Sequence, residues 1–294
     1  MIIGHHRQQQ ILDSHIVRGE ISHAYLFSGP EHVGKMAVAR AFAQKILPEP
    51  VHSDLVVIDS DVIGIGNIRE LKDRAGRTAW GGGYKVFIIS DAARMSREAA
   101  NSLLKILEEP LGQTVFILIA SSAESVLPTI LSRVWHLKFW PVSKHLIQEA
   151  LVQNNIGEEH ASLLAKMSFG RPGIALTKQE EPEVDIKKET KRLEQEFNSS
   201  IAGPVNERFL FAEKIARDSE TYLKWYNEMT TLMRLLMHNE LGTDKGDASF
   251  QVRMPLLQTT AALQSLLRHH PYMLRPYTNK KLLMEAVLFN VRPA

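Results

Sequence analysis

The 294-residue sequence predicts an α/β fold, in which a P-loop domain with a parallel sheet is followed by a small helical lid and an all-α C-terminal domain. Three observations predict it. The loop GPEHVGK, from Gly29 to Lys35, lies between an apolar run fit for a buried strand and a helix-prone segment. Short apolar runs then alternate with helical patterns up to residue 140. Beyond Trp140, apolar residues recur only at helical spacing.

The loop has the spacing of a phosphate-binding loop. Its glycines, Gly29 and Gly34, let successive backbone N–H groups point at an anion, while the following helix N-terminus and Lys35 add positive potential. The Ser or Thr that usually comes next would ligate magnesium, but this chain has Met36. Because a thioether is a soft ligand, the loop can cradle a phosphate without organising the metal. A tight strand-to-helix turn that binds nothing remains the alternative.

Five strands and the helices between them are expected in the first 140 residues. The strands are expected at residues 24–27, 55–58, 85–91 and 114–120, each with a short apolar run, and at 134–139, where the residues alternate as in a strand. Amphipathic or capped helices are expected within residues 4–20 and at 36–46, 68–79, 96–110 and 126–133. The loop at residues 80–83 consists of Trp80 and three glycines, and it ends the helix expected at 68–79. This alternation predicts a parallel sheet with helices on both faces.

The end of the strand at 85–91 bears on catalysis. In P-loop proteins this position carries an acid that holds the magnesium shell, and often a second acid that polarises the attacking water. Here the two positions are Ser90 and Asp91. Met36 and Ser90 are thus two independent losses of magnesium chemistry, and together they favour a loop that does not hydrolyse nucleotide.

Composition excludes several classes of protein. With 44% hydrophobic and 23% charged residues, the chain is typical of a soluble globular protein of two or three domains. No apolar run approaches the ~18–20 residues of a membrane helix, and the N-terminus lacks a signal-peptide core, so a cytoplasmic protein is expected. The absence of cysteine excludes disulfides and thiolate metal sites. A net charge of +2 is too small for a dedicated nucleic-acid binder.

The N-terminal histidines do not form a metal-binding pattern. Their spacings fit no known ligand pair, and no carboxylate is placed to assist them. They are His5, His6, His15 and His23. No metal site is therefore expected.

Three longer motifs carry a family resemblance. They are ISHAYLFSGP at 21–30, AANSLLKILEEP at 99–110 and LPTILSR at 127–133. In this order they resemble the bacterial clamp-loader subunits of DNA polymerase III, of the AAA+ class. The resemblance covers roughly residues 4–140, with weaker similarity in GRPGIAL at 170–176 and NKKLLME at 279–285. It is closer to the delta-prime type of subunit than to the gamma/tau motor type.

The departures from the family support that choice. The usual four-cysteine zinc insert is missing, so no zinc is expected. Met36 and Ser90 depart from the motor subunits, while the arginine of the family's Ser-Arg-Cys motif is kept as Arg133. The resemblance implies that Arg133 acts in trans on the ATP of a neighbouring subunit. Its own loop would need no cofactor, although ATP or ADP could bind there without hydrolysis.

The resemblance also implies an order of domains. A RecA-like AAA+ domain would span residues 1–140, a helical lid 141–178, a charged hinge 179–196 and an oligomerising collar 197–294. In the lid, Arg171 resembles the family's second sensor and could face a nucleotide phosphate, although an exposed loop arginine is an equal alternative. In the collar, leucines recur at helical spacing and residues 242–247 form a polar break.

The favoured interpretation is therefore a non-hydrolysing clamp-loader subunit. Its implied partners are gamma/tau and delta subunits, the sliding clamp and, through the assembled complex, primed DNA. Two alternatives remain. One is an active gamma/tau-like ATPase motor that uses Lys35 and Asp91. The other is a stand-alone AAA+ protein of DNA binding or repair.

Overall fold

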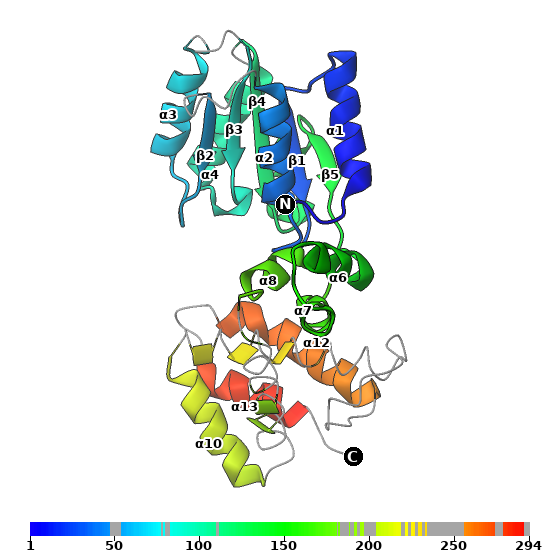
Figure 1. Ribbon diagram of the computed structural model, residues 1–294. Coiled ribbons are helices and arrows are strands. Elements are labelled where there is room, and N and C mark those ends of the chain that lie inside the picture. Colours follow the sequence, from blue (N-terminus) through cyan, green and yellow to red (C-terminus); the bar gives the residue numbers. More distant parts are fainter. Residues whose placement is uncertain are drawn as a thin grey trace. The chain divides into compact units, whose positions relative to one another are not determined.

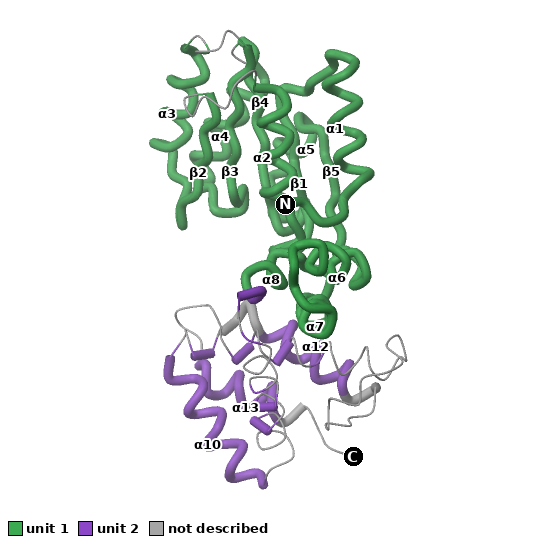
Figure 2. Tube along the Cα trace, viewed as in Figure 1, with its two compact units in different colours: residues 1–177 green, residues 178–294 purple. Residues whose placement is uncertain are grey.

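The computed structural model describes most of the N-terminal half and parts of the C-terminal half. The described residues are 1–47, 54–77, 79, 83–109, 112–180, 182, 188, 191–192, 195–196, 204–218, 221–222, 225–226, 229–230, 233, 256–273 and 279–290. They fall into two compact units, residues 1–177 and 178–294 (Figure 2). The predicted domain boundaries at 140, 178 and 196 stay predictions. The glycine-rich loop at 80–82 and the polar break at 242–247 lie outside the described residues.

The first unit is built on one parallel sheet in the order β2-β3-β4-β1-β5 (Figure 1). Its strands are β1 (Ala24–Ser28), β2 (Leu55–Ile58), β3 (Lys85–Ile89), β4 (Thr114–Ala120) and β5 (Trp135–Lys138). All five predicted strands are present. Since the strands are parallel, their carboxyl ends lie at one edge of the sheet, where ligands bind in folds of this type.

Helices cover both faces of this sheet (Figure 1). α1 (His6–Arg18) and α2 (Lys35–Ile46) pack on one face, and α3 (Ile65–Ala75), α4 (Arg97–Glu108) and the short α5 (Pro128–Leu131) on the other. Successive side chains of a strand point to opposite faces, so Tyr25 and Phe27 pack under α1 and α2 while Leu26 packs on the other side. Burial on both sides explains why the three inner strands, β1, β3 and β4, are mostly apolar.

Two expectations need correction. The strand at 55–58 was expected to be buried, but all four residues of β2 are half-exposed because β2 is an edge strand. The helix expected at 68–79 runs instead from Ile65 to Ala75. Its start escapes the hydrophobic pattern because Ile65 is exposed at 38% and the buried stripe begins at Ile68.

A buried lysine, Lys85, fixes the end of α3 against the start of β3. It is only 7% exposed, and its ammonium donates hydrogen bonds to the backbone carbonyls of Arg74, at 2.6 Å, and Arg77. These carbonyls lie at the helix C-terminus, where a cation also interacts favourably with the helix dipole.

Replacing Lys85 with methionine should therefore destabilise the chain. The change keeps the length of the side chain but removes the ammonium that bonds to two carbonyls, of which only that of Arg74 also accepts a described backbone N–H, and this should cost about 1–3 kcal/mol of unfolding free energy. Denaturant unfolding of the variant measures this cost. Lys72→Met, on the exposed side of α3, is the matched control and should change stability by less than about 0.5 kcal/mol. Equal stabilities of the two variants would show that Lys85 does not cap the helix.

The other edge strand, β5, and the segment after it each carry one exposed tryptophan. Trp135 and Trp140 are 51% and 59% exposed. Trp135 meets the His15 ring of α1 edge-on, with ring centroids 4.8 Å apart, and the Lys138 ammonium lies 4.2 Å from the centroid of Trp140. Gln8 of α1 donates to the Lys138 carbonyl at 2.7 Å and so covers part of the free edge of the strand.

Three helices complete the first unit: α6 (Lys144–Gln153), α7 (Glu158–Ser168) and α8 (Pro172–Thr177). The first two were expected, whereas α8 was not, because the bundle was expected to end at residues 170–173. Gly170 forms the turn between α7 and α8 with a positive φ of 72°. A Cβ there would lie 2.6 Å from the side chain of Pro141, so only glycine fits.

The described elements of the second unit are helical. They include α10 (Val205–Ala216), α12 (Leu256–Met273) and α13 (Lys280–Asn290). Their shared core contains Ala212, Ile215, Tyr222, Trp225, Tyr226, Met229, Met233, Ala262, Leu266, Met284, Val287 and Leu288. Phe209 and Leu267 were expected in the apolar stripes, but they are 42% and 45% exposed. No described helix is long and apolar enough to cross a membrane.

Candidate functional site

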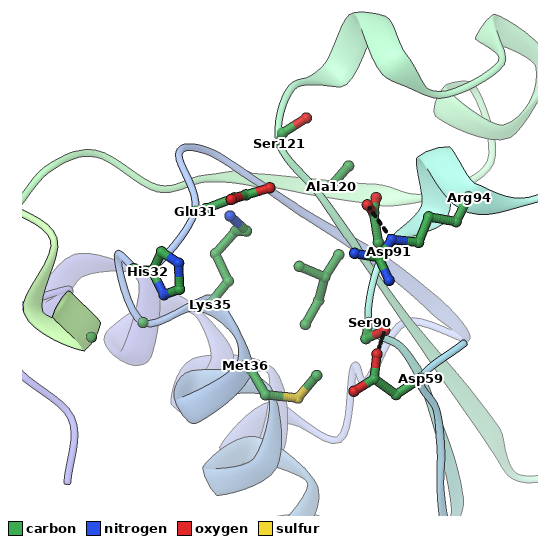
Figure 3. A pocket seen from close by; sticks show the side chains of 13 residues that line it. Glu31, His32, Lys35, Met36, Asp59, Ser90, Asp91, Arg94, Ala120 and Ser121 are labelled. Carbon is green, nitrogen blue, oxygen red and sulfur yellow. Dashed lines mark hydrogen bonds and ion pairs between the residues drawn. The ribbon is translucent and has the colours of Figure 1, made fainter. Parts of the chain in front are cut away.

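A cavity of about 540 Å³ opens at the carboxyl ends of the strands, where the predicted phosphate-binding loop lies (Figure 3). The loop and α2, the segments that follow β2 and β3, the end of β4 and the start of α8 all line it. The lining residues are Glu31, His32, Gly34, Lys35, Met36, Asp59, Ser90, Asp91, Arg94, Ile119, Ala120, Ser121 and Gly173. The structure thus brings together Gly34, Lys35, Met36, Ser90 and Asp91, as the sequence predicted.

The loop has the backbone conformation that its glycines allow. Gly29 and Gly34 have positive φ angles of 150° and 110°. At Gly29 a Cβ would lie 2.3 Å from the carbonyl oxygen of Phe139, so the loop could not pass this close to the end of β5 with any other residue. Gly29 is not among the described residues that line the cavity.

Lys35 holds the loop closed. Its side chain is only 7% exposed, and its ammonium donates to the carbonyls of Gly29 and Pro30 at 2.5 and 2.6 Å. Burial lowers the pKa of Lys35, while the nearby carboxylates of Glu31 and Asp91 oppose that shift. Since an ammonium has three N–H donors, one remains for a bound phosphate.

Two further loop carbonyls accept hydrogen bonds from segments that are distant in sequence. The Nε2–H of His5 donates a hydrogen bond to the Val33 carbonyl at 2.7 Å, and the His5 ring packs on Phe139. The Gly173 backbone N–H, at the start of α8, donates to the His32 carbonyl at 2.8 Å. The loop is thus held by the N-terminal segment and by the start of α8.

The magnesium-related positions have different partners from those of a hydrolysing site. Ser90 donates through its hydroxyl to the Asp59 carboxylate at 2.7 Å (Figure 3). Sequence analysis missed Asp59, although its place directly after the strand at 55–58 is a signal for a site at the carboxyl edge. Met36 lines the cavity with its thioether.

Both carboxylate oxygens of Asp91 are engaged. Oδ1 accepts the backbone N–H of Ala93 at 3.0 Å, and Oδ2 pairs with the Arg94 guanidinium at 3.2 Å (Figure 3). Arg94 also pairs with Asp61 at 3.5 Å. No pattern in the sequence singles out Arg94. The acid at the position of the water-polarising residue is therefore already paired with a cation.

Neither of the two predicted arginines, Arg133 and Arg171, is among the described residues that line this cavity. Arg171 is half-buried between α7 and α8, its backbone N–H donates to Ser168 at 3.0 Å, and it is not among the described lining residues. Arg133 follows α5 and is 37% exposed. Its Nη1 donates to the Thr129 carbonyl and the Ser132 hydroxyl, both at 3.0 Å, and its Nη2 pairs with Glu108 at 2.8 Å.

His5 makes the stability of the loop dependent on pH. Burial lowers the pKa of His5 below 6.5, with Lys35 and His6 adding to the shift. The unfolded chain then binds more protons than the folded chain as the pH falls below 6.5, so the free energy of unfolding decreases in that range. Above 6.5 the contribution of His5 is complete.

His5→Gln should remove this part of the pH dependence. Denaturant unfolding between about pH 5 and 8 should show a smaller loss of stability at low pH than in the wild type. His6→Gln, at an exposed position one residue away, is the control and should largely keep the wild-type slope. Parallel curves for the wild type and His5→Gln would show that His5 is not the group that titrates.

The chain matches a known protein family. The family model described as DNA polymerase III, delta subunit, matches residues 4–54 and 48–143. The match lies in the N-terminal part of the chain and covers just under half of its length. The matched residues contain the whole sheet, the loop and Arg133.

Characterised relatives include two types of DNA polymerase III subunit. Subunit delta' of Bacillus subtilis is 32% identical over 182 residues, which are 55% of each chain. Subunit gamma/tau of Mycobacterium tuberculosis is 35% identical over 143 residues, which are 41% of this chain and 25% of that relative. The chain thus spans about half the length of the first relative and a quarter of the second.

A solved structure agrees on the fold. The gamma subunit-related protein of DNA polymerase III from Thermotoga maritima aligns over 97% of both chains with a TM-score of 0.53 and 20% identity. At this identity the likeness concerns the fold alone. It confirms the predicted architecture of a parallel α/β domain followed by helices.

Proposed function

We propose that this chain is a non-hydrolysing, delta-prime-like subunit of the DNA polymerase III clamp loader. It completes the ATP site of a neighbouring gamma/tau subunit with Arg133. Together with gamma/tau and delta subunits it helps to open the sliding clamp and place it on primed DNA. The family match and the delta' relative support this assignment.

The engagement of Asp91 carries the non-hydrolysing part of the proposal. A carboxylate that polarises water must direct a lone pair at that water, so the contacts that orient its two oxygens decide whether it can do so. In this chain one oxygen of Asp91 caps a turn and the other pairs with Arg94. Met36 offers no hard ligand, and the Ser90 hydroxyl is bound to Asp59. ATP or ADP can therefore occupy the loop through Gly29, Gly34 and Lys35 without being hydrolysed there.

Arg133 supports the action in trans. A guanidinium is planar and always charged, and it can donate to phosphate through two N–H groups at once. Pro128 begins the short helix before it, and Arg133 remains partly exposed at the end of that helix. An arginine from a neighbouring subunit stabilises charge on the transferred phosphoryl group in many ATPases. Arg133 lies outside the cavity of its own chain, which fits a phosphate that belongs to a neighbour.

The proposal is tested by reconstitution with the gamma/tau and delta subunits and the sliding clamp of the same organism. Size-exclusion chromatography with light scattering should show a hetero-oligomer that contains this chain. Clamp loading on primed DNA should require it. Failure to join the complex, together with clamp loading that proceeds equally well without the chain, would refute the assignment.

The similarity to gamma/tau subunits keeps an active ATPase motor as the second candidate. Magnesium-dependent ATP hydrolysis by the isolated chain that disappears in Lys35→Ala would favour that candidate.

A further inference from the structure

One carboxylate, on Glu108, is bound to the proposed trans-acting arginine. Glu108 is the last residue of α4, and its Oε1 lies 2.8 Å from Nη2 of Arg133. Arg133 follows α5, so this ion pair joins two helices that are adjacent on one face of the sheet. The next residue, Glu109, is also exposed, but no ion pair to it occurs within the described part of the chain.

The Arg133 side chain has contacts within its own turn and a contact with another helix. Nη1 donates to Thr129 and Ser132, which belong to the same short turn as the arginine itself. These two contacts hold the Nη1 group of the guanidinium. Of the contacts described for Arg133, only that with Glu108 comes from another helix. This contact holds the Nη2 group. Together they determine the plane of the group.

The pairing leaves donors for a ligand. A guanidinium has five N–H donors, and the three contacts use three of them. Two donors thus remain on a group that is 37% exposed. Because the plane is already fixed, less side-chain freedom is lost when these donors bind a phosphate.

We propose that Glu108 is a positioning residue for Arg133 in the ATPase reaction of the neighbouring subunit. This inference rests on the proposed function of Arg133 as a trans-acting arginine. Glu108 itself touches no reacting group in this scheme. Its carboxylate holds the guanidinium in the orientation in which the two remaining donors meet the phosphate.

Because the ion pair between Glu108 and Arg133 is exposed, a positioning role of Glu108 can be distinguished from a role in folding. Glu108 is 49% exposed at its side chain, and ion pairs at such exposed sites contribute little to stability. Loss of Glu108 should therefore leave the melting temperature and the assembly of the complex unchanged. Its effect should appear only in the chemical step, where a misplaced catalytic group can lower the rate up to about 100-fold.

A double-mutant cycle in the reconstituted complex tests the inference. Glu108→Ala should lower single-turnover ATP hydrolysis at the site that receives Arg133 by about 10-fold, while KM for ATP stays unchanged. Glu108→Gln should retain part of the rate because its amide oxygen still accepts a hydrogen bond. Glu109→Ala, the matched control, should behave as the wild type. In the Arg133→Ala background, Glu108→Ala should have no further effect.

The outcomes separate this inference from the proposed function. A wild-type rate for Glu108→Ala, with Arg133→Ala impaired, would overturn the inference and leave the trans role of Arg133 standing. An equal loss from Glu108→Ala in both backgrounds would also overturn it, because the residue would then act independently of Arg133. A wild-type rate for Arg133→Ala itself would refute the proposed role of the arginine, and the positioning role with it.

Discussion

Replacing Arg133 with alanine is expected to lower ATP turnover at one site of the assembled complex by on the order of 10³-fold. The change removes the cation that would stabilise the transferred phosphoryl group of the neighbouring subunit. Folding and assembly should be unaffected, since the side chain is partly exposed and contributes no apolar core. Single-turnover hydrolysis in the reconstituted complex measures the effect, and light scattering confirms the assembly.

Arg133→Lys should restore little of this activity. An ammonium keeps the charge but lacks the fork that bonds to Thr129, Ser132, Glu108 and a phosphate at the same time. An alanine variant that assembles, hydrolyses ATP and loads clamps like the wild type would show that Arg133 only ties α5 to α4. The contacts with Glu108 and Ser132 would then be its whole function.

The isolated chain is expected to show no magnesium-dependent ATP hydrolysis. The reason is the combined loss of a hard ligand at Met36, the bonding of Ser90 to Asp59 and the pairing of Asp91 with Arg94. Turnover should stay far below the ~1 per second at the lower end of ordinary enzymes. The wild type and Lys35→Ala should be indistinguishable in a steady-state phosphate-release assay.

A restored hydroxyl should not be enough to create activity. Met36→Thr returns one magnesium ligand, but Asp91 remains paired with Arg94 in that variant. The variant should therefore hydrolyse no more ATP than the wild type. Turnover near 1 per second in the wild type, lost in Lys35→Ala, would contradict the non-hydrolysing assignment and favour a motor subunit.

Much of the fold of the first unit could be predicted because its signals are local. Four of the strands contain an apolar run, β5 shows an alternating pattern, and Ser96 and Pro110 frame α4 in the sequence. Errors occurred where exposure breaks the pattern, as at the start of α3 near Ile65. The lid helix α8 was missed because only six residues form it and they include Pro172 and Gly173.

The site could be predicted only in part. The loop motif locates Gly29, Gly34 and Lys35 without a structure, because their spacing is itself the signal. The partners of the degenerate positions lie far away in sequence: Asp59 is 31 residues from Ser90. Glu108 is 25 residues before Arg133, and no periodic pattern connects the two. Such pairs arise from the packing of separate elements, which a single sequence does not encode as a visible pattern.

The exposed edge of β5 has a spectroscopic consequence. Trp135 lies two residues after Arg133 and is 51% exposed, so its indole emits from a hydrated environment. A neighbouring subunit that receives the Arg133 guanidinium should displace water from this ring and shift its fluorescence to shorter wavelength. Trp140, beside the Lys138 ammonium, provides a second indole just after the end of β5.

Assembly should thus be visible without an attached label. The blue shift on mixing with gamma/tau should be lost in Trp135→Phe and kept in Trp140→Phe. A shift that persists in Trp135→Phe would place the neighbouring subunit on another part of the surface. If the shift behaves as expected, a titration of its amplitude gives the dissociation constant of the contact around Arg133 directly from the protein's own emission.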